Sequence, residues 1–131
     1  MKKILIIDDS NLFREFLSHK LEGYGFAITQ AGNGFEGIMK IRQSDYDLII
    51  MDIAMPIMDG LEATRVIRNY EKEQKEKDPS HVKLPIKIIA VTAHVIMTDR
   101  VKCMSAGMNE YLAKPYRPKE LTDVIDQLEI E

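Results

Sequence analysis

The sequence contains a single cysteine, no tryptophan, no long apolar run and no excess of positive charge. Cys103 alone cannot form an internal disulfide, and no group of cysteines and histidines has the spacing of a structural zinc site. The apolar runs fall far short of the ~20 residues of a membrane helix, and two aspartates interrupt the first run before it reaches signal-peptide length. With 18 basic and 21 acidic residues, the chain also lacks a basic surface for nucleic acid. We therefore expect a cytoplasmic protein that binds neither nucleic acid nor membrane.

The composition is typical of a globular chain, with 45% apolar and 30% charged residues. A length of 131 residues suits a single core, so we expect residues 1–131 to form one domain. Short runs rich in branched apolar residues predict strands that are buried on both faces of a parallel sheet. These runs are 4–7, 48–51 and 86–91, with weaker strands expected at 26–29 and 110–113.

Helical periodicity separates these strands. One helical stripe begins after Ser10 or Asn11, either of which can serve as its N-cap. Its apolar positions are Phe13, Phe16, Leu17, Leu21 and Tyr24. Four further helices are expected near 35–42, from 61 onward, at about 96–106 and around 121–128. Regular alternation of strands and helices predicts an α/β fold with right-handed crossovers.

The charged segment 71–83 is the one shift in composition along the chain. Its glutamate and lysine residues at i,i+4 spacing favour a helix, and Asp78-Pro79 then breaks the pattern. We interpret the segment as a solvent-exposed extension of the third helix followed by a surface loop. A partner-docking appendage is the alternative.

Polar residues follow four of the five predicted strands. Asp8 and Asp9 follow the first strand, Asp52 the third, Thr92 the fourth and Lys114 the fifth. The carboxyl ends of parallel strands share one edge of the sheet, which is the usual ligand crevice. Three carboxylates at this edge repel one another, and a hard cation such as Mg²⁺ would relieve that repulsion. Together with an amine and a hydroxyl, this group suits a phosphoryl group, and one carboxylate can act as the nucleophile.

Four segments at these strand ends resemble the receiver domain of the two-component response regulator family. They are 4–9 with the acidic pair, 51–60 (MDIAMPIMDG), 91–94 (VTAH) and 111–115 (YLAKP). The resemblance covers almost the whole chain. It implies a flavodoxin-like receiver fold, a doubly wound five-stranded parallel sheet of order 2-1-3-4-5 with helices on both faces.

The same resemblance implies roles for the acidic residues. Asp52 matches the phosphoacceptor. Asp9 matches a direct Mg²⁺ ligand, and Asp8 matches a residue that reaches the metal mainly through bound water. The backbone carbonyl of Ala54 and the carboxylate of Asp52 complete the expected ligand set, with Mn²⁺ as an alternative to Mg²⁺.

It also implies a switch. Lys114 matches the lysine that pairs with the phosphoryl group, and the peptide bond to Pro115 is expected to be cis. Thr92 matches the switch hydroxyl and Tyr111 the aromatic residue that turns inward when the hydroxyl moves. The last two helices and the strand between them would then form the face that binds an unknown downstream target.

The expected function is a phosphorylation-dependent switch or relay that accepts a phosphoryl group from a histidine kinase or a histidine phosphotransfer protein. A multiple-turnover enzyme is not expected. Ala54 and His94 flank the path of an attacking water in this family, and we expect slow autodephosphorylation because Ala54 cannot orient water. His94 is expected to screen the phosphoryl group, although it would speed hydrolysis if it positioned the water instead.

Several alternatives stay open at this point. The chain is a free-standing regulator, a relay intermediate or a fragment of a hybrid histidine kinase, and the start Met1-Lys2-Lys3 favours the first. A phosphatase with an aspartyl nucleophile is disfavoured because its general acid would stand at Ala54. A flavodoxin-like cofactor binder is disfavoured because Asp8 and Asp9 would repel a flavin phosphate. A degenerate receiver is disfavoured because Asp52, Thr92 and Lys114 are all present.

Overall fold

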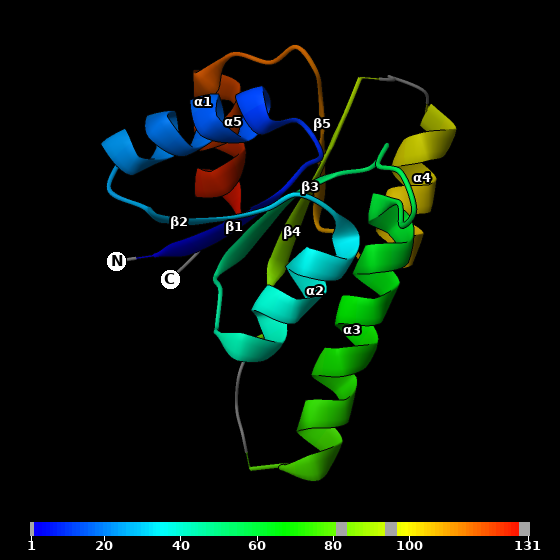
Figure 1. The fold of residues 1–131 in the computed structure, drawn as a ribbon. Helices are drawn as coiled ribbons and strands as arrows, with labels where there is room; N and C mark the ends of the chain where they lie inside the picture. Colours follow the sequence, from blue (N-terminus) through cyan, green and yellow to red (C-terminus); the bar gives the residue numbers. More distant parts are fainter. Residues whose placement is uncertain (1, 81–83, 94–96, 129–131) are drawn as a thin grey trace.

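The computed structural model of the chain describes residues 2–80, 84–93 and 97–128 (Figure 1). Five strands form one sheet of order β2-β1-β3-β4-β5, and all four neighbouring pairs are parallel. The strands are β1 (Lys3–Ile7), β2 (Ala27–Ala31), β3 (Leu48–Asp52), β4 (Lys87–Thr92) and β5 (Glu110–Ala113). The predicted fold class and strand order are confirmed, and each strand lies within two residues of its predicted range.

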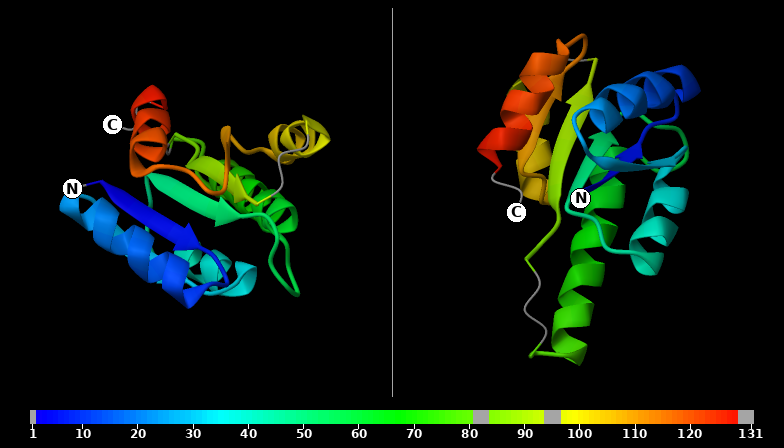
Figure 2. Two further views of the ribbon diagram at one scale, coloured as in Figure 1. Left: turned by 90° about the horizontal axis from the view of Figure 1, so that it is seen from above. Right: turned by 90° about the vertical axis from the view of Figure 1, so that its left-hand side faces the viewer.

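Five helices alternate with the strands and cover both faces of the sheet (Figures 1 and 2). They are α1 (Asn11–Gly23), α2 (Gly34–Gln43), α3 (Gly60–Lys77), α4 (Met97–Ala106) and α5 (Pro118–Gln127). The charged segment does extend α3, which reaches Lys77 and projects beyond the end of the sheet (Figure 2). Within the described part of the chain, no helix has both the length and the apolar character of a membrane crossing.

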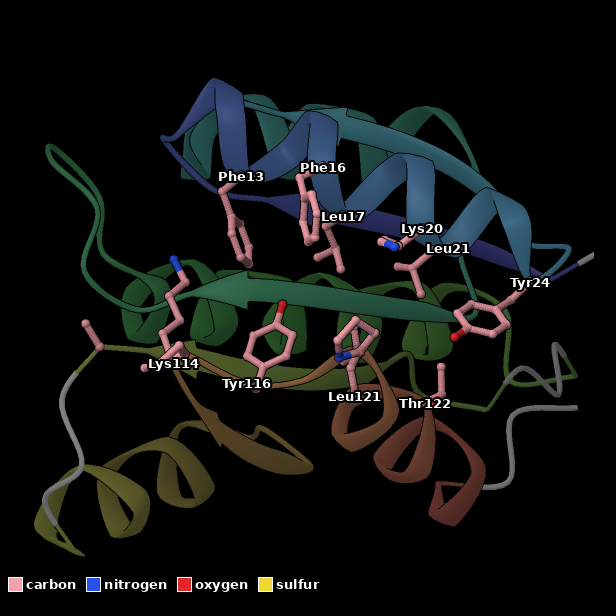
Figure 3. Close-up of a pocket in the computed structure, with 13 residues that line it drawn as sticks. Phe13, Phe16, Leu17, Lys20, Leu21, Tyr24, Lys114, Tyr116, Leu121 and Thr122 are labelled. Atoms are coloured by element: carbon pink, nitrogen blue, oxygen red, sulfur yellow. The ribbon is translucent and has the colours of Figure 1, made fainter.

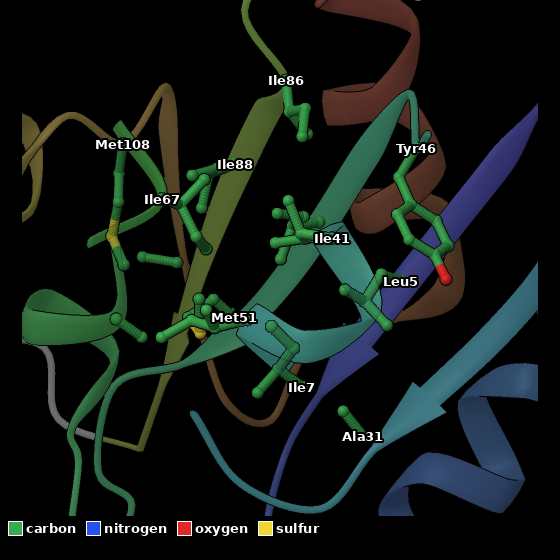
Figure 4. Packing of buried hydrophobic residues seen from close by; sticks show 14 of the residues in the cluster. Leu5, Ile7, Ala31, Ile41, Tyr46, Met51, Ile67, Ile86, Ile88 and Met108 are labelled. Atoms are coloured by element: carbon green, nitrogen blue, oxygen red, sulfur yellow. The ribbon is translucent and has the colours of Figure 1, made fainter. Parts of the chain in front are cut away.

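The core consists of two apolar layers, one on each face of the sheet. Because side chains alternate along a strand, Ile4 and Ile6 pack toward α1 and α5, whereas Leu5 and Ile7 pack toward α2, α3 and α4 (Figure 4). The middle strands β1, β3 and β4 are almost fully buried, as expected for a parallel sheet covered on both faces. This rigid sheet fixes the positions of the polar residues that follow its strands.

The apolar stripe predicted for α1 is wider than the face that α1 buries. Leu17 and Leu21 are buried, but Phe16 and Tyr24 are each 58% exposed. The cause is a groove between α1 and α5, which Phe16 and Tyr24 line instead of entering the core. Periodicity identifies one side of the helix but does not show how far a neighbouring helix stands from it.

Candidate functional site

The sheet brings the predicted site residues to one edge. Asp52 is the last residue of β3 and Thr92 the last residue of β4, while Asp8 directly follows β1 and Lys114 directly follows β5. The Lys114 backbone N–H donates to the Thr92 carbonyl at 2.6 Å, which holds the end of β5 beside the end of β4. The edge lies where successive connections leave β1 and β3 in opposite directions, the position at which open α/β sheets bind ligands.

Three carboxylates form the centre of this edge. One carboxylate oxygen from each of Asp8, Asp9 and Asp52 lies within 4.8 Å of the other two. Asp8 and Asp52 are buried, whereas Asp9 is exposed at the rim. Carboxylate oxygens are the ligands that Mg²⁺ takes in proteins, and a partly open rim leaves room for the waters that Mg²⁺ retains. The donor set therefore fits a hard divalent cation.

The crowding of these carboxylates changes the acidity of Asp52. Burial, and then the negative charge of Asp8, raise the pKa of Asp52 from 3.8 to about 6. The positive charge of Lys114 and a hydrogen bond from the Ala54 backbone N–H, at 3.2 Å to Asp52 Oδ1, oppose this rise. Among the described residues, Asp52 Oδ1 is the carboxylate oxygen that accepts a hydrogen bond.

Asp8 is the most firmly held of the three acids. Its Oδ1 accepts from the Ser10 backbone N–H at 2.9 Å, and its Oδ2 accepts from Lys114 Nζ at 3.1 Å. The guanidinium of Arg14 also donates to the Asp8 backbone carbonyl. Ser10 is the N-cap of α1, so the start of this helix and the acidic pair are fixed together.

The loop after Asp52 depends on a close approach at Gly60. A Cβ atom at this position would stand 2.9 Å from Ile53 Cα and would also overlap the Asp52 carbonyl oxygen. The Gly60 N–H donates to the Ile53 carbonyl at 2.9 Å, which closes the loop between β3 and α3. This role of Gly60 was not predicted from the sequence, although the Asp59-Gly60 pair at the start of α3 is a visible signal for a turn there.

The predicted switch residues lie on two neighbouring strands, Thr92 on β4 and Tyr111 on the edge strand β5. Thr92 is buried at the end of β4. Tyr111 is partly exposed on β5, where it pairs with Ala90 and packs against the core layer of α2, α3 and α4. The Lys114–Pro115 peptide bond is cis, as predicted. His94, predicted at the rim, lies outside the described residues.

An aromatic residue that sequence analysis assigned only to the core also reaches the site. The ammonium of Lys114 stands 4.1 Å from the centre of the Phe13 ring (Figure 3). Phe13 and Lys114 lie at one end of the groove between α1 and α5, a cavity of about 570 Å³ with mostly apolar walls. No sequence signal separates Phe13 from the other apolar residues of α1, because its contact partner is about a hundred residues away.

Comparison with known proteins gives a consistent result. The model of the response regulator receiver domain family matches residues 4–126. Over 122 residues the chain is 38% identical to hybrid signal transduction histidine kinase B of Dictyostelium discoideum, which covers 92% of this chain. It is 37% identical to the sensor histidine kinase CheAY of Helicobacter pylori over 93% of this chain. The chain spans 6% of the length of the first kinase and 14% of the second.

Solved structures give the same match in three dimensions. The chemotaxis protein CheY4 of Vibrio cholerae has a TM-score of 0.83 at 27% identity, with 97% of this chain and 98% of that chain covered. The receiver domain of the sensor histidine kinase PA1611 from Pseudomonas aeruginosa has a TM-score of 0.80 at 32% identity, with 96% and 95% covered. That receiver domain carries a magnesium ion in its active site cleft.

Proposed function

The chain belongs to the response regulator receiver domain family, whose members are phosphoacceptors in signalling, and we propose that Asp52 is the phosphoacceptor of this one. The observation that carries the proposal is the cluster of Asp8, Asp9 and Asp52 with Lys114 at its side. An acidic group that can bind a cation, with an ammonium beside it, supplies the charge stabilisation that phosphoryl transfer needs. We extend the proposal to a single receiver domain over residues 1–131.

In the proposed reaction, a phosphohistidine of a partner protein is the donor. A carboxylate oxygen of Asp52 attacks phosphorus, the P–N bond breaks, and its electron pair returns to the imidazole of the donor. The product is an acyl phosphate on Asp52. Lys114 pairs with the phosphoryl oxygens, and the Thr92 hydroxyl donates a hydrogen bond to them.

The metal in this proposal is Mg²⁺, which the Pseudomonas receiver domain coordinates in its own active site cleft. Asp8, Asp9, Asp52 and the backbone carbonyl of Ala54 would hold it here, with Asp8 acting mainly through water. Bound at this place, the ion would offset the negative charge of the carboxylates and the phosphoryl group. Mn²⁺ is the expected substitute, because it takes the same oxygen ligands.

The partner and the setting are also proposals. The donor is a histidine kinase or a histidine phosphotransfer protein, and the signal leaves through the face of α4, β5 and α5 toward a downstream protein. The matches to hybrid kinases support a receiver that forms part of such a kinase as much as a free-standing one. A cytoplasmic location belongs to the same proposal.

Acetyl phosphate with Mg²⁺ tests this function in the absence of the partner. We expect labelling that stops at one phosphoryl group per chain, as measured by intact mass, and none after Asp52→Asn. Asp59→Asn is the matched control, since Asp59 lies outside the cluster, caps α3, and asparagine also caps helices. Sustained release of phosphate by Asp52 at a high rate would instead indicate a phosphatase, and absence of labelling would indicate a degenerate receiver.

A further inference from the structure

The ammonium of Lys114 is held from two sides. Asp8 Oδ2 lies 3.1 Å from Lys114 Nζ. The same ammonium lies over the face of Phe13, with the ring centre 4.1 Å away (Figure 3). A cation at this distance from an aromatic face is attracted by the negative charge of the ring's π surface. The Lys114 side chain is 25% exposed, so water weakens this attraction less than it would on an open surface.

The Phe13 ring is itself fixed in place. Its backbone N–H donates to Ser10 Oγ at 3.2 Å, in the first turn of α1. The ring meets Tyr116 edge to face, with 6.2 Å between the ring centres and 89° between the planes. The hydroxyl oxygen of Tyr116 is buried without a hydrogen-bond partner among the described residues, so aromatic packing holds this ring rather than a hydrogen bond.

We propose that Phe13 is a positioning residue for phosphoryl transfer, which acts by holding the Lys114 ammonium beside the acidic cluster. The inference rests on the proposed function, in which Lys114 pairs with the phosphoryl group. A lysine side chain has a long flexible stem, and one ion pair alone leaves the ammonium free to swing about that contact. A second contact, with the aromatic face of Phe13, restricts the positions of the Lys114 ammonium before the phosphoryl group arrives. The lysine side chain then has to move less when the transition state forms.

The first test changes the ring electronically and leaves its shape nearly unchanged. Fluorinated phenylalanines with one, two and three ring fluorines are placed at position 13, and the rate of labelling by acetyl phosphate with Mg²⁺ is measured. Each fluorine withdraws charge from the ring face and weakens its attraction for a cation. The logarithm of the rate should fall steadily with the number of fluorines, whereas a purely structural role for Phe13 predicts no trend. A flat series overturns the proposal.

The second test asks whether Phe13 acts through Lys114. Phe13→Leu should slow labelling about three- to tenfold, the range of a cation–π contact. Phe13→Leu should have no further effect on the labelling rate in a Lys114→Gln background. Phe13→Tyr should label at nearly the wild-type rate, because tyrosine keeps the aromatic face. Phe16→Leu, one helical turn away in the same groove, is the control and should label like wild type.

The outcomes separate this inference from the proposed function. Equal slowing by Phe13→Leu in both backgrounds, or the same slowing by Phe16→Leu, would overturn the positioning role. Mg²⁺ affinity, measured on the same proteins, should not change, because the hydrogen bond and ring contacts of Phe13 in the described structure are with Ser10, Lys114 and Tyr116. A wild-type protein that accepts no phosphate would instead refute the proposed function.

Discussion

Lys114 Nζ lies 3.1 Å from Asp8 Oδ2, which joins residues 106 positions apart at the edge of the sheet. The pair connects the end of β5 to the end of β1 across the two strands between them. Asp8 is only 2% exposed, so its carboxylate has little water to replace the lysine. The same ammonium is proposed to pair with the phosphoryl group. Lys114 therefore has two roles: it neutralises Asp8 in the folded protein, and it supplies positive charge to the reaction.

Removal of this ammonium should therefore destabilise the fold. We expect Lys114→Gln to lower the free energy of unfolding by about 1–3 kcal/mol without Mg²⁺, because a buried carboxylate loses its partner. Lys119→Gln, which breaks an exposed ion pair with Asp123 on α5, should cost about 0.5 kcal/mol or less. Urea unfolding of both variants measures the difference. Equal, small effects would mean that the Asp8 contact contributes no more than a surface pair.

The raised pKa of Asp52 predicts a pH-dependent effect of Asp52→Asn on stability. Because burial and Asp8 raise the pKa from 3.8 to about 6, ionisation of Asp52 costs free energy in the folded state. This cost is absent below pH 3.8 and complete above pH 6. With chelator present, Asp52→Asn should be about 1–2 kcal/mol more stable than wild type near pH 7.5 and similar near pH 4. A stability difference between Asp52→Asn and wild type that does not change with pH would contradict a raised pKa of Asp52.

The loop after β3 should not tolerate a side chain at Gly60. A Cβ there would press on Ile53 Cα and the Asp52 carbonyl, so Gly60→Ala should cost about 1–3 kcal/mol and weaken Mg²⁺ binding by displacing the Asp52 loop. Gly23→Ala is the matched control, because beyond its chain neighbours and the backbone of its own helix nothing lies within 4 Å of the Cβ it would add. Thermal unfolding and Mg²⁺ titration measure both effects. Unchanged Mg²⁺ affinity in Gly60→Ala would show that the conformation of this loop does not affect metal binding.

The switch predicts a change that depends on the Thr92 hydroxyl. Beryllofluoride, a phosphoryl mimic, should shift amide resonances of β5 and α5 in the wild type, because new hydrogen bonds favour one conformation. In Thr92→Val, which keeps the shape and loses the hydroxyl, the shifts around Tyr111 should be much smaller. Thr122→Val removes a partly exposed hydroxyl of α5, which donates to the Lys119 carbonyl, and should respond like wild type. Full shifts in Thr92→Val would exclude the hydroxyl from the switch.

The fold and the acidic cluster could be predicted from the sequence because both depend on short segments: the apolar runs that form strands and the residues that directly follow them. Apolar runs mark the strands, and in a parallel sheet whatever follows a strand reaches the same edge, so Asp8, Asp52 and Lys114 were predictable neighbours. The contact between Phe13 and Lys114 was not predictable in this way. It depends on how α1 is rotated and how far it stands from α5, which the periodicity of a single helix does not contain.

The proposal that Asp52 is the phosphoacceptor is tested most directly by chemical identification of the phosphorylated residue. After treatment with acetyl phosphate and Mg²⁺, borohydride reduces an aspartyl phosphate to homoserine, which mass spectrometry of peptides locates in the sequence. We expect homoserine at position 52 in the wild type and at no position in Asp52→Asn. Homoserine at Asp8, Asp9 or another acid in the wild type, with position 52 unmodified, would contradict the proposal.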